Sequence, residues 1–379
     1  MAQAIFLRGA RQLLTLRGPS VPRTGSALGN LEIIEDGSLL IRDGVIVQVG
    51  STRRLENLRE ARQAVELAVN GAVVMPGFVD ASMAVQASVA PNGRVTATPF
   101  FETCSALLRS SVQHGTLHAQ LRVSAGSSDL RANFSALRQI LSLGSRMHGL
   151  TRCWSMAEET TLSNSVEAIA QLAERKLAHR IDVPATSRTQ ALYAAAHSER
   201  LGINLLYQSG CREDLRDTLA SARPRTVICE EALHDNECSV LAEFGLPVVV
   251  APIRCLINDI YCGSVRRLIQ WGGALALGSG YESRESPVFN MQMAISLAVL
   301  RLGLSAEEAI AAATVNAAYA AGVGHLTGTL EVGKRADLLI LDLPDYRELP
   351  RQFGSNHVLL ALREGKLAVN RSGHKVILV

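Results

Sequence analysis

Aromatic and charged residues are both scarce in this 379-residue sequence. Phenylalanine, tryptophan and tyrosine make up 4% of it and charged residues 19%, against about a quarter charged in a typical globular protein. The low charge content disfavours long disordered tails. A core with so few rings must rest on Ala, Val, Leu and Ile, which suits helices packed on parallel strands. The 47% hydrophobic content is ample for one large domain or two.

Long apolar runs, a leader segment and basic clusters are missing as well. No apolar run approaches ~20 residues, so we expect no membrane span. The segment Met1–Gly18 contains arginines and has no small-residue cleavage site, so we expect no signal peptide and a cytoplasmic location. The 38 Lys and Arg residues are scattered among 35 Asp and Glu residues, so we expect no nucleic-acid partner.

The cysteines show no pairing pattern. Their number, seven, is odd, and no C-x-x-C motif occurs. We therefore expect buried, reduced thiols rather than a disulfide framework. The cysteines are Cys104, Cys153, Cys211, Cys229, Cys238, Cys255 and Cys262.

Both ends of the chain have β character. Leu39–Val49 contains two strand-like runs around an Asp-Gly pair, which is a strong hairpin signal. Ala336–Leu343 resembles a strand, and Val358–Val369 resembles a hairpin about a Glu-Gly pair. Because isolated hairpins are only marginally stable in water, we expect both ends to combine into one discontinuous β-sandwich domain.

The middle of the chain alternates between strand-like and helical segments. Roughly eight apolar strand-like runs occur, the number that a closed parallel barrel needs. A doubly wound open sheet is the alternative, but no G-x-G-x-x-G follows an early strand. We predict a (β/α)8 barrel over residues 76–322 and a composite β-domain of residues 1–75 and 323–379. The runs lie near Val73–Val79, Leu117–Val123, Leu150–Met156, Ile181–Val183, Ile203–Tyr207, Thr226–Cys229, Val248–Ala251 and Ala274–Leu277.

The active site of a parallel barrel lies at the carboxyl ends of its strands. The residues that follow the predicted strands include few carboxylates and no histidine. The candidates for catalysis at this mouth are Asp80, Gln208, Cys211, Glu230 and Ser279. A polar loop after the last strand offers Tyr281, Arg284 and Glu285 as candidates for a ligand pocket, although a solvated loop has the same pattern.

Several of these residues have ordinary structural explanations. Glu230 is a candidate general acid or base, but a buried acceptor satisfied by Gln208 or an arginine is the interpretation that we favour. His114 and His118 stand four residues apart, as on a metal-binding helix. The Gly-Thr pair between them breaks a helix, which favours one loop histidine and one strand histidine. His234 is expected at the start of a helix.

Two longer motifs resemble the amidohydrolase superfamily. Met75–Asp80, Met-Pro-Gly-Phe-Val-Asp, resembles the strand that opens the barrel in that superfamily, and Thr314–Ala318 followed by Gly328–Asp337 resembles its barrel exit. The similarity is closer to the imidazolonepropionase family, which opens a cyclic imidazolone in histidine breakdown. That closer similarity rests on Ala10–Gly18, His114–Thr116, Ser286–Pro287 and Gly354–Asn356.

The resemblance implies a metal site at positions where this sequence has other residues. The family has a His-x-His pair where Ser82 and Ala84 stand here. Its next histidine, and the glutamate shortly after it that handles protons, fall at Gln208 and Cys211.

Two further positions depart from the family in the same way. A histidine after the sixth strand corresponds to Glu230. The aspartate that activates water in the family falls at Gly280.

These departures predict that no metal cofactor is bound. Ala84 and Gly280 have no ligating atom, whereas a catalytic zinc site needs about three protein ligands. Without a metal, bound water keeps a pKa of roughly 16. We therefore expect a degenerate amidohydrolase, leaning away from an enzyme, that does not open imidazolone propionate. It would bind a small molecule at the barrel mouth, or scaffold a second copy or another protein. The alternative is a hydrolase of C–N bonds in a cyclic amide, with an unusual metal or none.

Overall fold

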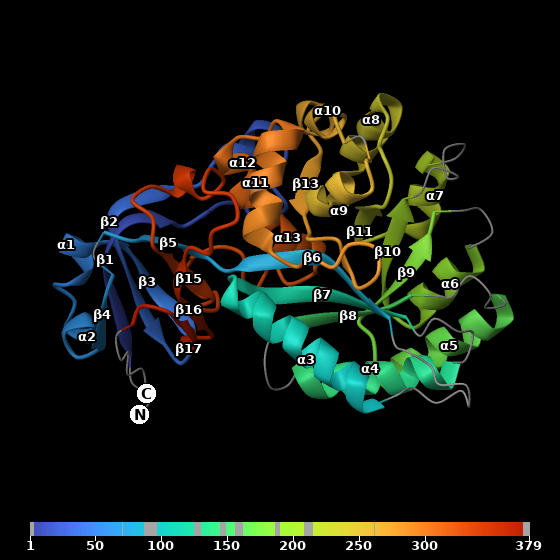
Figure 1. The fold of residues 1–379 in the computed structure, drawn as a ribbon, viewed down its shortest axis with the longest axis horizontal. Helices are drawn as coiled ribbons and strands as arrows, with labels where there is room; N and C mark the ends of the chain where they lie inside the picture. The colour runs from blue at the N-terminus through green and yellow to red at the C-terminus, as the bar shows by residue number, and fades with distance from the viewer. Residues whose placement is uncertain are drawn as a thin grey trace.

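The computed structural model describes residues 4–69, 71–86, 97–124, 130–144, 149–155, 162–185, 190–207, 215–260 and 262–373. Its described strands form two sheets, one built from the two ends of the chain and one from the middle (Figure 1). None of the described helices has the length and apolar character needed to span a bilayer.

The terminal sheet combines the first and last strands of the chain. Its order is β17-β16-β15-β5-β1-β2-β3, and β4 pairs with β1. The expected hairpins are β2–β3 and β16–β17, both antiparallel. The expected sandwich is not confirmed, because the described strands of both ends make one sheet. The boundaries of the composite domain stay a prediction. The strands are β1 (Ile5–Leu14), β2 (Ile33–Arg42), β3 (Val45–Ser51), β4 (Val65–Ala68), β5 (Val73–Pro76), β15 (Leu338–Leu341), β16 (Val358–Arg363) and β17 (Lys366–Asn370).

The second sheet is parallel throughout and curled. Its order is β13-β12-β11-β10-β9-β8-β7-β6-β14. The strands are β6 (Phe78–Gln86), β7 (Thr116–Ser124), β8 (Gly149–Ser155), β9 (Arg180–Pro184), β10 (Gly202–Tyr207), β11 (Thr226–Cys229), β12 (Pro247–Val250), β13 (Ala274–Leu277) and β14 (Tyr281–Glu282). The fold is therefore mixed α/β, with a curled parallel sheet and an additional sheet.

The last segment of the curled sheet lies along its first strand. β13 pairs with β12, whereas β14, a few residues later, pairs with β6 through Tyr281 and Glu282. Between these two strands, the amide of Gly280 donates to the carbonyl of Ser82 at 2.9 Å. The curl brings residues from the start and the end of the middle region together.

One expected barrel strand is divided between the two sheets. We predicted a single strand over Val73–Val79, but residues 73–76 pair with β1 and β15 in the terminal sheet. The backbone partner changes within two residues. The amide of Gly77 donates to Asp337, and the amide of Phe78 donates to Gly115, both at 3.0 Å. The junction between the two sheets therefore lies at Gly77.

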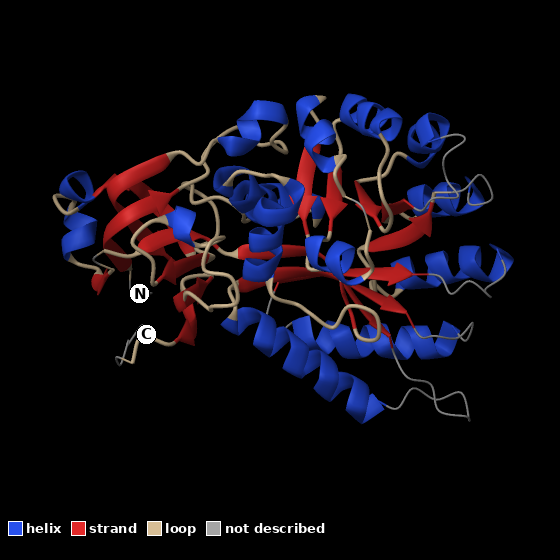
Figure 2. Ribbon diagram, turned by 45° about the horizontal axis from the view of Figure 1, so that its top comes forward, coloured by secondary structure: helices blue, strands red, loops and turns tan. Residues whose placement is uncertain are grey.

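Helices surround the curled sheet on its outer side (Figure 2). They are α3 (Ala97–Gln113), α4 (Leu130–Gly144), α5 (Leu162–Glu174), α6 (Gln190–Ser198), α7 (Leu215–Ala222), α8 (Asp235–Phe244), α9 (Pro252–Ile257), α10 (Val265–Gln270), α11 (Met291–Leu302) and α12 (Ala306–Ala311). A further helix, α13 (Ala317–Ala320), lies at one end of the sheet. The short helices α1 (Thr52–Leu55) and α2 (Arg59–Arg62) belong to the terminal region.

Helix α13 packs against the amino ends of the strands, which we call the base of the curled sheet. The hydroxyl of Thr226, at the start of β11, donates to the carbonyl of Ala320 at 2.7 Å. The hydroxyl of Thr151 on β8 donates to the carbonyl of Ala321 at 2.8 Å. The opposite side, at the carboxyl ends of the strands, is the mouth.

Candidate functional site

The candidates near the first strand lie inside it rather than after it. We expected Asp80, Ser82 and Ala84 at a strand end, but β6 continues to Gln86. The strand is this long because it pairs with β7 as far as Ser124 and with β14 on its other side. Ser82 and Ala84 are therefore held in strand backbone.

Asp80 is fully buried and joins β6 to the segment after β13. Its Oδ1 atom accepts hydrogen bonds from the amides of Ser279 at 2.9 Å and Ser82 at 3.1 Å. Its Oδ2 atom is buried and has no hydrogen-bond partner among the described residues. Burial raises the pKa of Asp80 to about 6, against the opposing effect of the hydrogen bonds from Ser279 and Ser82. Asp80 is therefore a structural clamp that changes its protonation near neutral pH.

Gly280 is the position at which the resemblance led us to expect the family's water-activating carboxylate. Its φ of +67° is a conformation that side chains rarely adopt. A Cβ atom at this position would lie 2.5 Å from the Cβ of Ala251 and 2.9 Å from that of Arg254. The fold therefore leaves no room for a side chain at Gly280.

Four charged residues form a network across the mouth. The Nε atom of Arg122 on β7 lies 2.7 Å from Asp182 Oδ2 on β9, and its Nη1 atom lies 2.7 Å from Glu230 Oε1, just after β11. Arg254 on α9 approaches the same Glu230 oxygen at 3.5 Å. We call Arg122, Asp182, Glu230 and Arg254 the mouth network. Its two positive and two negative charges balance.

The charges of this network interact strongly because the side chains are largely buried. The side chain of Asp182 is 1% exposed, Glu230 10%, Arg122 16% and Arg254 23%. Burial lowers the pKa of Arg122, but the charges of Asp182 and Glu230 outweigh burial and raise it. The guanidinium of Arg122 therefore stays charged, and Arg254 is the member most accessible to a ligand.

Sequence reasoning found only one member of the network. Glu230 is a buried acceptor satisfied by arginines, as we favoured, and Arg122 is its nearer partner. Arg122, Asp182 and Arg254 were not among the predicted site residues. The first two are charged residues within apolar strand runs, and that signal was present in the sequence. Their partners lie too far along the chain to be assigned from spacing.

The other predicted site residues differ in burial and do not form one site. Ser279 is buried, and its hydroxyl accepts from the amide of Tyr281 at 3.1 Å. Tyr281 is buried too, whereas Arg284 and Glu285 are exposed on a turn whose amides donate to Glu282. Glu285 reaches back to Arg254 at 3.8 Å. The predicted candidates Gln208 and Cys211 lie outside the described residues.

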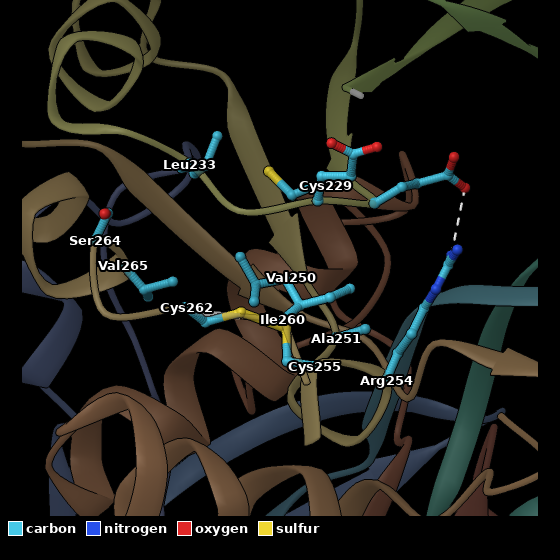
Figure 3. A pocket seen from close by; sticks show the side chains of 12 residues that line it. Cys229, Leu233, Val250, Ala251, Arg254, Cys255, Ile260, Cys262, Ser264 and Val265 are labelled. Atoms are coloured by element: carbon cyan, nitrogen blue, oxygen red, sulfur yellow. Dashed lines mark hydrogen bonds and ion pairs between the residues drawn. A yellow bond between two sulfur atoms is a disulfide. The ribbon is translucent and has the colours of Figure 1, made fainter. Parts of the chain in front are cut away.

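A small pocket lies beside Glu230, and it corrects the expectation for the cysteines (Figure 3). Cys255 and Cys262 on its wall form a disulfide, with Cα atoms 6.8 Å apart. Cys255 lies on α9 and Cys262 follows seven residues later, a pairing that cysteine counting does not detect. The pocket has a volume of about 10 Å³, close to the minimum that one water needs. It is too small for a substrate.

The histidines that we considered have structural roles. The Nε2 atom of His118 lies 3.0 Å from Thr151 Oγ1, and burial is the main cause that lowers its pKa to about 3. The Nδ1 atom of His114 lies 2.9 Å from the carbonyl of Ser110. His234 is the N-cap of α8, as expected.

The described part of the site does not fit a zinc ion held by three protein ligands. Within the described residues, no group of three or more His, Cys, Asp or Glu side chains is arranged to hold a metal. Ala84 and Gly280 offer no ligating atom, and Arg122 and Arg254 already engage Glu230.

Comparisons with known proteins extend over nearly the whole chain. Residues 265–368 match the amidohydrolase family. The chain is 29% identical to the imidazolonepropionase of Symbiobacterium thermophilum, over 97% of each chain. It is 26% identical to that of Geobacillus kaustophilus, over 97% of this chain and 98% of the relative.

Solved structures share the fold at lower identity. A triazine hydrolase variant has a TM-score of 0.78 at 15% identity, covering 97% of this chain and 95% of its own. Guanine deaminase of E. coli has a TM-score of 0.71 at 16% identity, covering 98% and 100%. Atrazine chlorohydrolase from Arthrobacter aurescens, complexed with zinc, has a TM-score of 0.74 at 15% identity, covering 97% and 96%.

Proposed function

Because this chain is an amidohydrolase-superfamily protein related to imidazolonepropionases, we propose that it hydrolyses a C–N bond in a small cyclic amide of the imidazolone type. The observation that carries this proposal is the similarity to imidazolonepropionases over 97% of both chains. The comparisons favour this hydrolase over the binding or scaffold protein that the substituted metal positions led us to expect.

The mouth network supports a site for a polar ligand. It lies on the side of the curled sheet where parallel barrels bind their substrates. Its charges are balanced internally, so a neutral ring can enter without leaving a charge unpaired. Arg254 is held loosely, at 3.5 Å from Glu230 and 3.8 Å from Glu285. Its guanidinium is therefore available to a carboxylate on the substrate.

Glu230 is the residue that we assign to proton transfer. Hydrolysis adds the oxygen of water to the ring carbonyl carbon and breaks the bond from that carbon to nitrogen. The water loses one proton and the leaving nitrogen gains one. A carboxylate at the mouth can carry this proton. Glu230 is the more exposed of the two carboxylates of the mouth network, and Arg122 fixes its position at 2.7 Å.

We further propose that this reaction does not depend on a metal bound by histidines. The position of the family's water-activating carboxylate is Gly280, and its first histidine pair is replaced by Ser82 and Ala84. Among the described residues, Arg122 is paired with Asp182 and Glu230, and Asp80 Oδ1 accepts from the amide of Ser279. The loss of the metal site is therefore part of the proposal and follows from the residues at these positions.

The test is turnover of imidazolone propionate, followed as loss of the ring absorbance and as formation of the opened product. We expect turnover by the wild-type chain. The variant Glu230→Gln should lower kcat by roughly 10²- to 10⁴-fold, the usual contribution of general acid–base catalysis. The control is Glu243→Gln, which removes an exposed carboxylate of α8 paired with Arg216 and should leave kcat unchanged. No turnover by the wild type overturns the proposal.

Ligand binding without turnover is the second candidate function. It is favoured by Ser82, Ala84 and Gly280, whose side chains cannot reproduce the family's metal site. Calorimetric titration with imidazolone propionate separates the two functions. Saturable binding that Arg254→Gln weakens, with no product formed, supports this second function over the first.

A further inference from the structure

A second cavity lies at the base of the curled sheet, away from the mouth. Its volume is about 880 Å³, within the range of small-molecule sites. Its walls come from the turns that lead from α5, α6 and α7 into the next strands. Six basic side chains line it, namely His179, Arg180, His197, Arg200, Arg223 and Arg225. No Asp or Glu belongs to the part of the wall that the structure describes.

The arginines of this cavity have no carboxylate partners. Arg180, Arg200, Arg223 and Arg225 form no ion pair with any carboxylate of the described residues, whereas both arginines of the mouth network do. Arg180 forms the floor and is 6% exposed. Its Nη1 atom donates to neutral acceptors, including Asn204 Oδ1 at 2.8 Å. Among the described residues, no carboxylate forms an ion pair with the arginines of this cavity.

The backbone positions two of these arginines in an uncommon way. Arg200 follows α6 with a φ of +58°, and Arg223 follows α7 with a φ of +42°. Helices commonly end in this left-handed conformation with glycine, because glycine has no Cβ. Here the position carries an arginine in two successive turns, and both side chains line the same cavity.

The pKa of the neighbouring histidine, His179, is lowered as well. Burial, followed by the charges of Arg152 and Arg180, lowers the pKa of His179 to about 4. His179 is therefore neutral near pH 7 and available as a hydrogen-bond donor. The arginines supply the charge of the site.

We propose that this base cavity binds a small anion with two or more phosphate groups, of which pyrophosphate is the simplest. Guanidinium groups match phosphate oxygens with paired, charge-assisted hydrogen bonds. The four arginines approach one space from different turns, so they suit an anion with several oxygens on more than one centre. Arg180 and Tyr319 also line the cavity, whose volume of about 880 Å³ suits a small molecule.

The test is calorimetric titration of the full-length protein with sodium pyrophosphate at low salt and at physiological salt. We expect one site per chain, with affinity that falls as salt rises. The double variant Arg223→Gln, Arg225→Gln should weaken binding at least tenfold. The matched control is Arg53→Gln, Arg54→Gln, which removes two exposed charges on α1 and should leave binding unchanged.

Four results would overturn the proposal, three with pyrophosphate and one with citrate. The first is no saturable binding at low salt, and the second is equal weakening in both double variants. The third is loss of binding in Arg254→Gln, because that result would locate the anion at the mouth. Inorganic phosphate and citrate are the comparison ligands. If citrate binds as tightly as pyrophosphate, the cavity recognises charge alone and the assignment to phosphate fails.

Discussion

The mouth and the base of the curled sheet both carry arginines, but only the arginines at the mouth are paired with carboxylates among the described residues. At the mouth, Arg122 and Arg254 face Asp182 and Glu230, and the charges balance. At the base, four arginines line a cavity with no carboxylate among its described residues. This difference matches the two proposals: at the mouth Arg254 contacts the carboxylate of a substrate whose ring is neutral, whereas the arginines at the base bind a small anion.

The two regions are joined through the interior of the sheet. The amide of Asn204 donates to Asp182 Oδ1 at 2.7 Å, and its oxygen accepts from Arg180 at 2.8 Å. Asp182 in turn pairs with Arg122 at the mouth. Because these hydrogen bonds are buried, removing a charge at the mouth leaves a buried partner without its opposite charge. Removing an exposed arginine at the base leaves no such buried partner.

The largest difference in unfolding free energy should follow from removing one arginine at the mouth and one at the base. Arg122→Ala leaves Asp182 and Glu230 buried without their shared cation, which should cost about 3–5 kcal/mol of unfolding free energy. Arg225→Ala at the base should change it by less than about 0.5 kcal/mol. Urea unfolding of both variants measures this contrast. Similar losses in the two variants would contradict the comparison.

The second prediction concerns the pH dependence of Asp80. Its pKa of about 6 lies above the value near 3.9 expected in the unfolded chain. Between these values the folded state binds more protons, so stability should fall as pH rises from about 4 to 6. The contribution is up to about 3 kcal/mol. The stability of the wild type relative to Asp80→Asn, from urea unfolding, should therefore decrease between pH 4 and 7. A flat difference would show that Asp80 stays ionised.

The third prediction tests whether the mouth can accept the family's carboxylate. Gly280→Asp should destabilise by roughly 2 kcal/mol, because its Cβ meets Ala251 and its φ is positive. Gly245→Asp is the matched control. Gly245 has a φ of +62°, but a Cβ atom added there would meet no other atom within 4 Å. The control should lose only about 1 kcal/mol of unfolding free energy, the cost of a side chain at a positive φ. Equal melting temperatures for the two variants would remove the steric argument.

The smallest effect is expected at the edge of the mouth. Glu285 is 62% exposed and lies 3.8 Å from Arg254. Such an exposed pair contributes little, so Glu285→Gln should change the unfolding free energy by less than about 0.5 kcal/mol. Its effect should appear instead in the KM for a substrate with a carboxylate, since Arg254 loses a competing partner. An unchanged KM would argue against Arg254 as the carboxylate contact.

Local sequence signals predicted the fold better than the site. The Asp43-Gly44 and Glu364-Gly365 pairs predicted two hairpins correctly, because turn chemistry acts over a few residues. The strand runs of the middle region were found, but not the change of partner at Gly77. That change depends on backbone groups of Asp337 and Gly115, which are distant in sequence.

The site depends on such distant contacts throughout. Arg122 and Glu230 are 108 residues apart, yet they form one ion pair. The pairing of Cys255 with Cys262 likewise follows from the fold and not from the cysteine count. The assignment of substituted family positions, such as Gly280, stays a prediction, and sequence reasoning did not find the charged residues that meet at the mouth.

The proposal that the reaction does not depend on a histidine-bound metal is the centre of this account, and the melting temperature with and without metal tests it most directly. A tightly bound ion stabilises the folded state by about 4 kcal/mol at a thousandfold excess over its Kd. For a protein of this size, that should raise the melting temperature by several degrees. We predict that EDTA, and then zinc, leave it unchanged. A saturable, reversible rise with one zinc ion per chain would contradict the account.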